Sequence, residues 1–341
     1  MRWKRAASLL ALIVLLLAGV LALLSLPAGH QSLGRVPVVL AIDQRTARAF
    51  VANYGSDTVS ILDATTGLVQ RTQAVAGHPL AIAVDERGAR VAVASEGPPG
   101  QPGTLTVLVA ADGSALSTTR VGVGPAAVAV DPTTRHAFVL NLDGASLSTV
   151  EMRTGRTLRT TPIRLIDLHF VEHPACAGII PLNVCYSNAT AGRLIQFNER
   201  AWYVVHQHPG GLVVDERRHH LFVVATMNNT VDEFDTRTGT LLRTIPVGLA
   251  PCAMALDPQT GQSFVSNLDS DSVSVVDTVR GATLRTIAVG HAPSTLALDA
   301  HDGRIVTANQ QDSTASIVDI RHPAAARTLP VGYAPTALAV D

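Results

Sequence analysis

A segment in which a proline is followed six residues later by an aspartate recurs seven times along this chain of 341 residues. The prolines are Pro37, Pro79, Pro125, Pro209, Pro251, Pro293 and Pro335. Four of the six spacings between consecutive prolines are 42 residues, one is 46, and one is 84, which is two periods with a degenerate copy between them. Self-similarity at a period of roughly 20 to 50 residues is typical of repeat architectures. The chain is therefore built from one repeated unit.

Two further landmarks keep a fixed distance from the proline, and short alternating segments lie between them. Asparagine stands sixteen residues after the proline at Asn53, Asn141, Asn267 and Asn309. An acidic residue stands twenty-six residues after it at Asp63, Glu151, Asp235, Asp277 and Asp319. Segments such as TVSILD (58–63) and SVSVVD (272–277) put hydroxyl side chains on one face and Val or Ile on the other, which predicts strands. Each unit reads as four strands, and no helical periodicity follows residue 28.

Four short strands in every period predict an all-β fold. A radial arrangement of small four-stranded sheets, as in a propeller, would leave only short sheet edges exposed. We expect a seven-bladed β-propeller of four-stranded antiparallel blades over residues 29–341. A β-sandwich would not place landmark residues at fixed offsets in seven copies. Pro335 repeats the role of Pro37, so a truncated propeller of eight blades stays open as the alternative.

Several of these motifs resemble a known repeat family. They are FVANYGSDTVSILD (50–63), FVSNLDSDSVSVVD (264–277), VTANQQDSTASIVD (306–319) and the link PVGYAPTALAVD (330–341). On them the chain is similar to the YVTN-type β-propeller repeat proteins over essentially all of residues 33–341. The resemblance implies an exported propeller protein, and it carries an architecture rather than an activity.

The N-terminus predicts export and a membrane anchor. Residues 1–5 read MRWKR, and residues 6–28 contain no charged side chain. A helix of this length spans about 30 Å, the thickness of the bilayer hydrocarbon. We expect residues 1–28 to form a cytoplasmic basic tip and a signal-anchor transmembrane helix in the cell membrane, with the propeller on the extracytoplasmic side. Secretion after signal cleavage is the alternative.

Composition excludes several function classes. Lys4 is the single lysine, which leaves the folded part without a Gly-Lys phosphate loop or a Schiff-base lysine. The 26 basic and 27 acidic residues are evenly scattered, which argues against a nucleic-acid partner. We found no catalytic signature in the motifs, and we expect no cofactor.

The fourth unit, 163–207, departs from the repeat and contains two of the three cysteines. Cys176 and Cys185 are nine residues apart, and in an oxidising compartment they predict a disulfide. The same stretch contains His169 and His173, so a zinc or copper site is the alternative. Cys252 stands in the expected first strand of its unit, where other units have a small residue, and we expect it to be a buried thiol.

A candidate binding face follows from the repeat. The segments before each proline and after each asparagine should lie at the same end of the blades. The proline side contributes Arg35, His78, His208, His291 and Tyr333. The asparagine side contributes Asn53, Asn141, Asn267 and Asn309, with Asp57, Asp143, Asp269 and Asp312. Turn capping alone also explains the recurring Asn and Asp positions.

Two functions from different classes remain. The first is a membrane-anchored binding or scaffold module that holds an unidentified protein, polymer or small ligand at one propeller face. The alternative is a metal-dependent propeller enzyme of lactonase or lyase type, with its metal site at the mouth of the central channel. The enzyme hypothesis predicts that three or four of the Asp, Asn and His side chains named above converge within ligand distance.

Overall fold

A computed structural model describes residues 33–163, 185–187, 194–196, 211–322, 326–333, 335 and 338. The chain divides into two compact units, of which the first ends at Pro162 and the second begins at Ile163. Residues 1–28, with the predicted anchor, lie outside the described part. In that part no helix is long and apolar enough to cross a membrane.

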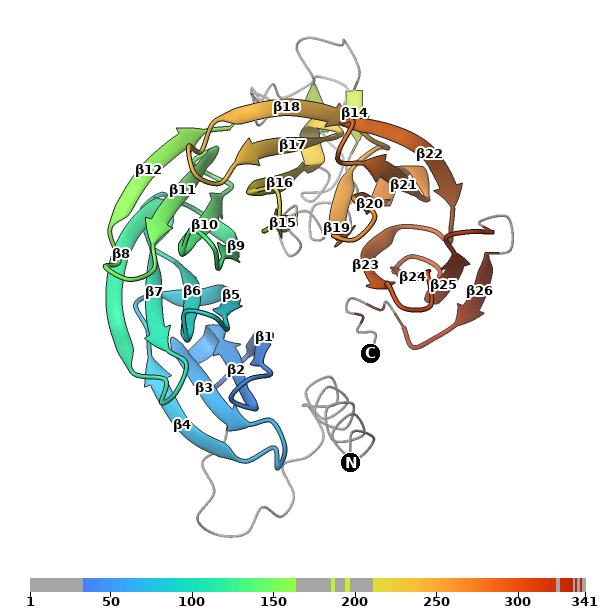
Figure 1. The fold of residues 1–341 in the computed structure, drawn as a ribbon. Helices are drawn as coiled ribbons and strands as arrows, with labels where there is room; N and C mark the ends of the chain where they lie inside the picture. The colour runs from blue at the N-terminus through green and yellow to red at the C-terminus, as the bar shows by residue number, and fades with distance from the viewer. Residues whose placement is uncertain are drawn as a thin grey trace. The chain divides into compact units, whose positions relative to one another are not determined.

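The first unit contains three four-stranded sheets, which Figure 1 colours from blue to green. Their strands are β1 (Pro37–Asp43), β2 (Arg48–Asn53), β3 (Thr58–Asp63) and β4 (Val69–Ala74); β5 (His78–Asp85), β6 (Arg90–Glu96), β7 (Pro102–Val109) and β8 (Ala115–Val123); and β9 (Pro125–Asp131), β10 (His136–Asn141), β11 (Ser146–Glu151) and β12 (Thr157–Pro162). Consecutive strands pair antiparallel in each sheet.

The second unit contains three more four-stranded sheets and one two-stranded sheet. The four-stranded sheets are formed by β15 (Leu212–Asp215), β16 (His220–Ala225), β17 (Thr230–Asp235) and β18 (Leu241–Pro246); β19 (Pro251–Asp257), β20 (Gln262–Asn267), β21 (Ser272–Asp277) and β22 (Ala282–Ala288); and β23 (Pro293–Asp299), β24 (Arg304–Asn309), β25 (Thr314–Asp319) and β26 (Arg327–Pro330). The pair is β13 (Cys185–Ser187) with β14 (Leu194–Gln196).

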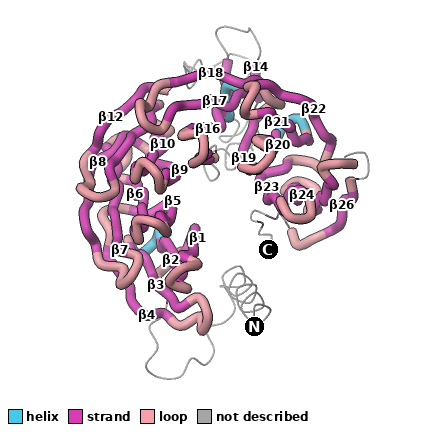
Figure 2. Tube along the Cα trace, viewed as in Figure 1, coloured by secondary structure: helices cyan, strands magenta, loops and turns pink. Residues whose placement is uncertain are grey.

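The described chain is almost entirely strand and loop (Figure 2). The helices in it are single 3₁₀ turns, namely η1 (Tyr54–Ser56), η3 (Thr226–Asn228) and η4 (Leu268–Ser270). The predicted all-β architecture of four-stranded antiparallel sheets is therefore confirmed. The segments 58–63 and 272–277, predicted from their alternation, are β3 and β21.

Burial differs from strand to strand in each sheet. The second and third strands are the core, and Phe50 in β2 and Ile61 in β3 are at most 1% exposed. The fourth strands are mostly exposed, as the sequence VQRTQA of β4 illustrates. Neighbouring sheets of a unit pack through their first strands, since β5 contacts β1 and β9, and β19 contacts β15 and β23. Apolar side chains fill these interfaces, for example Phe264 with Leu296.

The recurring aspartate six residues after each proline closes the turn between the first two strands. Its carboxylate accepts hydrogen bonds from backbone N–H groups two or three residues further on, a typical Asx turn. Asp43 accepts from the amides of Arg45 and Thr46 at 3.0 and 3.1 Å. Asp257 accepts in the same way from Gln259 and Thr260 at 2.9 and 3.4 Å. This local demand explains why aspartate recurs there.

Candidate functional site

Two kinds of segment meet at one end of four of the described sheets, as the repeat predicts. One is the link before the first strand, and the other is the loop between the second and third strands. Backbone hydrogen bonds join them, from the amides of Tyr54, Leu142, Leu268 and Gln310 to the carbonyls of Val36, Gly124, Ala250 and Ala292, at 2.8 to 3.0 Å. We call this the loop end of a sheet. The opposite end, formed by the other two strand connections, is the turn end.

The four recurring asparagines are buried beneath the loop end. Each side chain is 0% exposed. Each Nδ2 donates to a serine hydroxyl on the third strand, and the pairs are Asn53 with Ser60, Asn141 with Ser148, Asn267 with Ser274 and Asn309 with Ser316, at 2.9 to 3.0 Å. Buried hydrogen bonds of this kind fix local structure. The asparagines therefore brace the loop end from below and do not lie on its surface.

Glycine in the link makes room for these asparagines. A Cβ atom on Gly34 would lie 2.6 Å from Cγ of Asn53, and one on Gly248 would lie 2.5 Å from Cγ of Asn267. The amide of Gly248 also donates to Ser274 Oγ at 3.2 Å. Glycine, asparagine and serine thus form one structural triad in each regular sheet.

Four ionisable side chains gather at the loop end in the first unit. His78 Nδ1 lies 2.6 Å from Asp57 Oδ1, and both side chains are 49% exposed. The rings of Tyr54 and His78 are tilted against each other with centroids 4.8 Å apart. Glu96 pairs with His78 across strands β5 and β6. Burial, then the charges of Glu96 and Asp57, and a hydrogen bond with Glu96 raise the pKa of Tyr54. We call these four residues the Tyr54 cluster.

A second histidine and carboxylate pair lies at the loop end in the second unit. His291 Nδ1 lies 2.8 Å from Asp271 Oδ2, and the His291 amide donates to Asp312 Oδ2 at 3.1 Å. Asp271 also accepts from the amide of Ala292 at 2.9 Å. The hydrogen bond and charge of Asp271, followed by the charge of Asp312, raise the pKa of His291.

Replacing Asp271 with asparagine is expected to lower the pKa of His291 toward its ordinary value of about 6.5, because the hydrogen bond and the charge that favour the imidazolium are both weakened. Any stabilisation from this raised pKa is complete below the unfolded pKa and is lost as the pH rises through the folded pKa. An NMR titration of the histidine Cε1 protons measures the shift. An unchanged His291 pKa in Asp271→Asn would contradict it.

The aspartates that pair with histidine stand at a recurring position of the loop, from which they contact the next sheet. Asp57, Asn229 and Asp271 all stand twenty residues after their prolines, and each has a left-handed backbone. Asn229 Oδ1 accepts from the amide of Ala250 at 2.8 Å, which is the contact that Asp271 makes in the next sheet. Asp and Asn tolerate this conformation better than most residues. Sequence reasoning named Asp57 but missed Asn229 and Asp271, although the twenty-residue offset was visible.

The remaining candidates lie apart. Arg35 is at the loop end, and its amide donates to Ser56 Oγ at 3.0 Å. Tyr333 is 83% exposed.

Burial and the charge of Asp271 raise the pKa of Asp269. His208, Cys176, His169 and His173 lie outside the described residues, as does the side chain of Cys185, so the predicted disulfide and its metal alternative stay predictions. Burial raises the pKa of the Cys252 thiol to about 12 and keeps it protonated.

A buried ionic cluster in the second unit escaped the sequence analysis. Glu233 in β17 is 0% exposed and forms ion pairs with His220, Arg243 and Arg218. Arg218 and Arg243 also each donate to the carbonyl of Thr278, in the turn of the next sheet, at 2.8 Å. The cluster therefore joins the sheet of β15–β18 to that of β19–β22.

Asp232, next to Glu233, is buried at the position where the four regular sheets carry the triad serine. Burial raises its pKa, against hydrogen bonds from Thr244 and Thr230. A carboxyl whose folded pKa is raised stabilises the fold below its unfolded pKa of about 3.9, and this contribution is lost as the pH rises through the folded pKa. Asp232→Asn should therefore raise the melting temperature at pH 7 and much less at pH 4. Equal shifts at both pH values in thermal unfolding would contradict the assignment.

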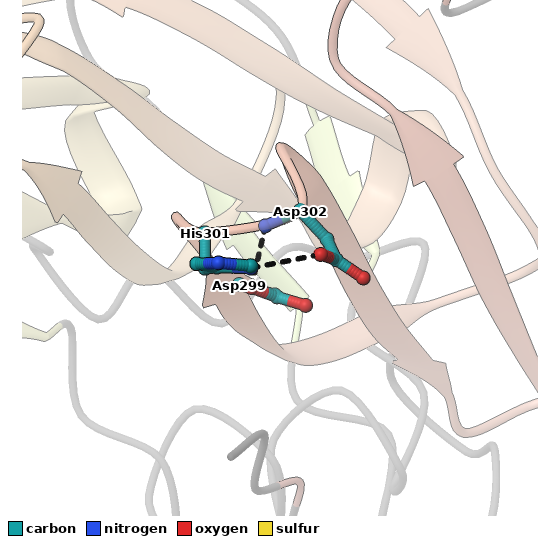
Figure 3. Close-up of side chains that lie close together, drawn as sticks. All are labelled: Asp299, His301 and Asp302. Atoms are coloured by element: carbon teal, nitrogen blue, oxygen red, sulfur yellow. Dashed lines mark hydrogen bonds and ion pairs between the residues drawn. The ribbon is translucent and has the colours of Figure 1, made fainter.

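Among the described residues, one trio of potential metal ligands comes together: Asp299, His301 and Asp302 (Figure 3). It lies at the turn end between β23 and β24 and includes none of the predicted candidates. Asp299 accepts from the Asp302 amide at 2.9 Å, and His301 Nδ1 lies 2.9 Å from Asp302 Oδ1. Arg304 forms a further ion pair with Asp302 at 3.3 Å. The Asx turn and these ion pairs account for the trio without an ion.

No protein-family model matches the sequence, and no curated protein matches it. The fold is similar to the crystal structure of a functionally unknown protein from Desulfotomaculum acetoxidans DSM 771, with a TM-score of 0.57 and 11% sequence identity. The match covers 85% of this chain and 84% of that one. At this identity the likeness shows the fold alone.

Proposed function

We propose that this protein is a seven-bladed β-propeller, anchored in the cell membrane by residues 1–28, which acts as an extracytoplasmic binding module through its loop ends. Six four-stranded sheets at the proline period support the blade number, with the degenerate unit supplying the seventh. The uncharged run of residues 6–28 behind a basic tip supports the anchor. The resemblance to YVTN-type propellers agrees with both.

One observation carries the binding role. At the loop end, the recurring asparagines are buried, as Asn53 and Asn267 are, and the exposed histidines stand at different positions from sheet to sheet. His78, which pairs with Asp57, stands one residue before its proline, and His291, which pairs with Asp271, stands two residues before its proline. Loops that a rigid scaffold positions and whose side chains are free to vary are typical of binding surfaces.

A ligand screen tests this role. Thermal unfolding of the full chain is measured against neutral, anionic and cationic small molecules and short polymers, since a ligand that binds the folded state raises the melting temperature. We expect a binder whose effect disappears when both Tyr54 and His78 are replaced by alanine. The effect should persist in Arg153→Ala, an exposed change at the turn end. A binder lost only in Arg153→Ala, or no binder in the whole screen, would contradict the proposal.

The anchor is tested separately. The mass of the protein from its native membrane should be that of the uncleaved chain, and alkaline carbonate should not extract it. A soluble chain that begins near residue 29 would instead establish the secreted alternative.

A further inference from the structure

We infer that the Tyr54 cluster binds an organic cation, namely an ammonium or guanidinium group, a specificity that rests on the proposed binding role of the loop end. The cluster combines an aromatic ring with two carboxylates, from Asp57 and Glu96, and a histidine. These are the groups that recognise a nitrogen cation, through its attraction to a ring face and through charge-assisted hydrogen bonds.

Within the cluster, each carboxylate has a neutral or titratable partner. Asp57 meets the imidazole of His78, and Glu96 meets the phenol of Tyr54. No arginine forms an ion pair with either carboxylate in the described residues. Burial first, and then the charges of Glu96 and Asp57, raise the pKa of the Tyr54 phenol. The two carboxylates give the cluster a negative potential that an incoming cation would neutralise.

The charges around the cluster favour the same sign of ligand. In the first unit, the described loop ends carry Asp57, Glu96 and Asp143, with His78 and one arginine, Arg35. In the second unit they carry Asp269, Asp271 and Asp312, with His291 and no arginine. The arginines of the first unit other than Arg35 lie on the fourth strands and at the turn ends. An acidic surface attracts cationic ligands and speeds their association.

The aromatic ring separates this cluster from the other acidic positions. His291 has carboxylates around it but no aromatic neighbour within the described residues. Asp143 lies in the loop between β10 and β11, which is equivalent to the loop that carries Asp57. No aromatic ring contact is present at this loop in the described residues. Tyr54 therefore makes its cluster the specific site, and Asp143 offers a matched acidic control.

The test is calorimetric titration of the full chain with butylguanidine and with its uncharged isostere butylurea. We expect butylguanidine to bind at least about tenfold more tightly, since hydrogen bonds between charged groups are worth about that factor. Glu96→Gln and Asp57→Asn should each weaken binding about tenfold, and Tyr54→Ala similarly. Tyr54→Phe, which keeps the ring, and Asp143→Asn should bind like the wild type. The melting temperature of each variant confirms that it folds.

A second arm distinguishes the two sources of a guanidinium group. The peptide acetyl-Gly-Arg-Gly-amide presents it as a protein side chain, and butylguanidine presents it as a free small molecule. Tighter binding of the peptide assigns the site to a basic segment of a partner protein. Tighter binding of butylguanidine assigns it to a free small molecule that carries a guanidinium group.

Three results would overturn the inference: equal affinity for butylurea, unchanged affinity in folded Glu96→Gln and Asp57→Asn variants, or no binding of either guanidinium probe at millimolar concentration. A neutral or anionic ligand that binds and is lost in Tyr54→Ala would refute the cation specificity but leave the binding role of the loop end standing.

Discussion

Replacing Gly248 with alanine is expected to lower the free energy of unfolding by about 1 to 3 kcal/mol, the usual cost of overpacking a buried position. The new Cβ would lie 2.5 Å from Cγ of Asn267 and 2.6 Å from Oγ of Ser270. Asn267 cannot move away easily, because its Nδ2 donates to Ser272 and Ser274 at 3.1 and 3.0 Å in a buried site. Urea unfolding of the full chain measures the loss.

The chain supplies both a matched control and a rescue for this prediction. Gly332 stands at the same position before its proline, but a Cβ there meets no atom within 4 Å, so Gly332→Ala should change stability little. In the sheet of β5–β8 the corresponding pair is Ala76 with Ser95. Asn267→Ser should therefore recover part of the stability lost in Gly248→Ala. Strictly additive losses in the double variant would show that the two side chains do not compete for space.

Replacing Glu233 with glutamine is expected to cost about 3 to 5 kcal/mol, the range found when one partner of a buried ion pair is removed. The change would leave Arg218 and Arg243 without their shared carboxylate in an interface between two sheets. Both arginines also hold the carbonyl of Thr278, so the loss should loosen the contact between those sheets. Chemical unfolding gives the energy, and amide hydrogen exchange in β17 and β21 locates it.

An exposed ion pair provides the comparison. Arg280 is 80% exposed and pairs with Asp277 at 2.8 Å. Arg280→Ala should cost less than about 1 kcal/mol, as exposed ion pairs usually do. If Glu233→Gln and Arg280→Ala prove equally mild, the Glu233 cluster does not join the two sheets.

Periodicity made the strands predictable. Alternation along 58–63 and 272–277 depends only on which side chains avoid water, and the structure forms strands over those residues. The role of the asparagines was harder to predict. An asparagine at a strand end is compatible both with a solvent-facing turn and with a buried side chain that hydrogen-bonds to the neighbouring strand. The serine seven residues further on, Ser60 after Asn53 for example, was the available signal for burial.

The candidate site was predictable only in part. His78 and His291 stood out because they break the repeat, Asp57 was named with the recurring positions after the asparagines, and the structure pairs His78 with Asp57. Asp271 was missed although it stands at the same twenty-residue offset from its proline as Asp57. The offset marks the position, but the contact with a histidine of the next sheet depends on the fold and on a left-handed backbone.

Glu233 was missed for a different reason. In TVDEFD (230–235), the acidic side chains of Asp232 and Glu233 suggest contact with water, whereas the structure buries both. The partners of Glu233 come from two other segments, 218–220 and β18 with Arg243, which only the fold brings together.

The triad beneath the loop end has a consequence for how proteins of this kind can diversify. Gly248, Asn267 and Ser274 support the loop from below through contacts with one another. Mutations in exposed side chains that do not hold the loop can therefore accumulate one sheet at a time with little loss of stability. Under the proposed binding role, selection for a new ligand would act on positions such as Tyr54 and His291, and the triad beneath them could stay the same.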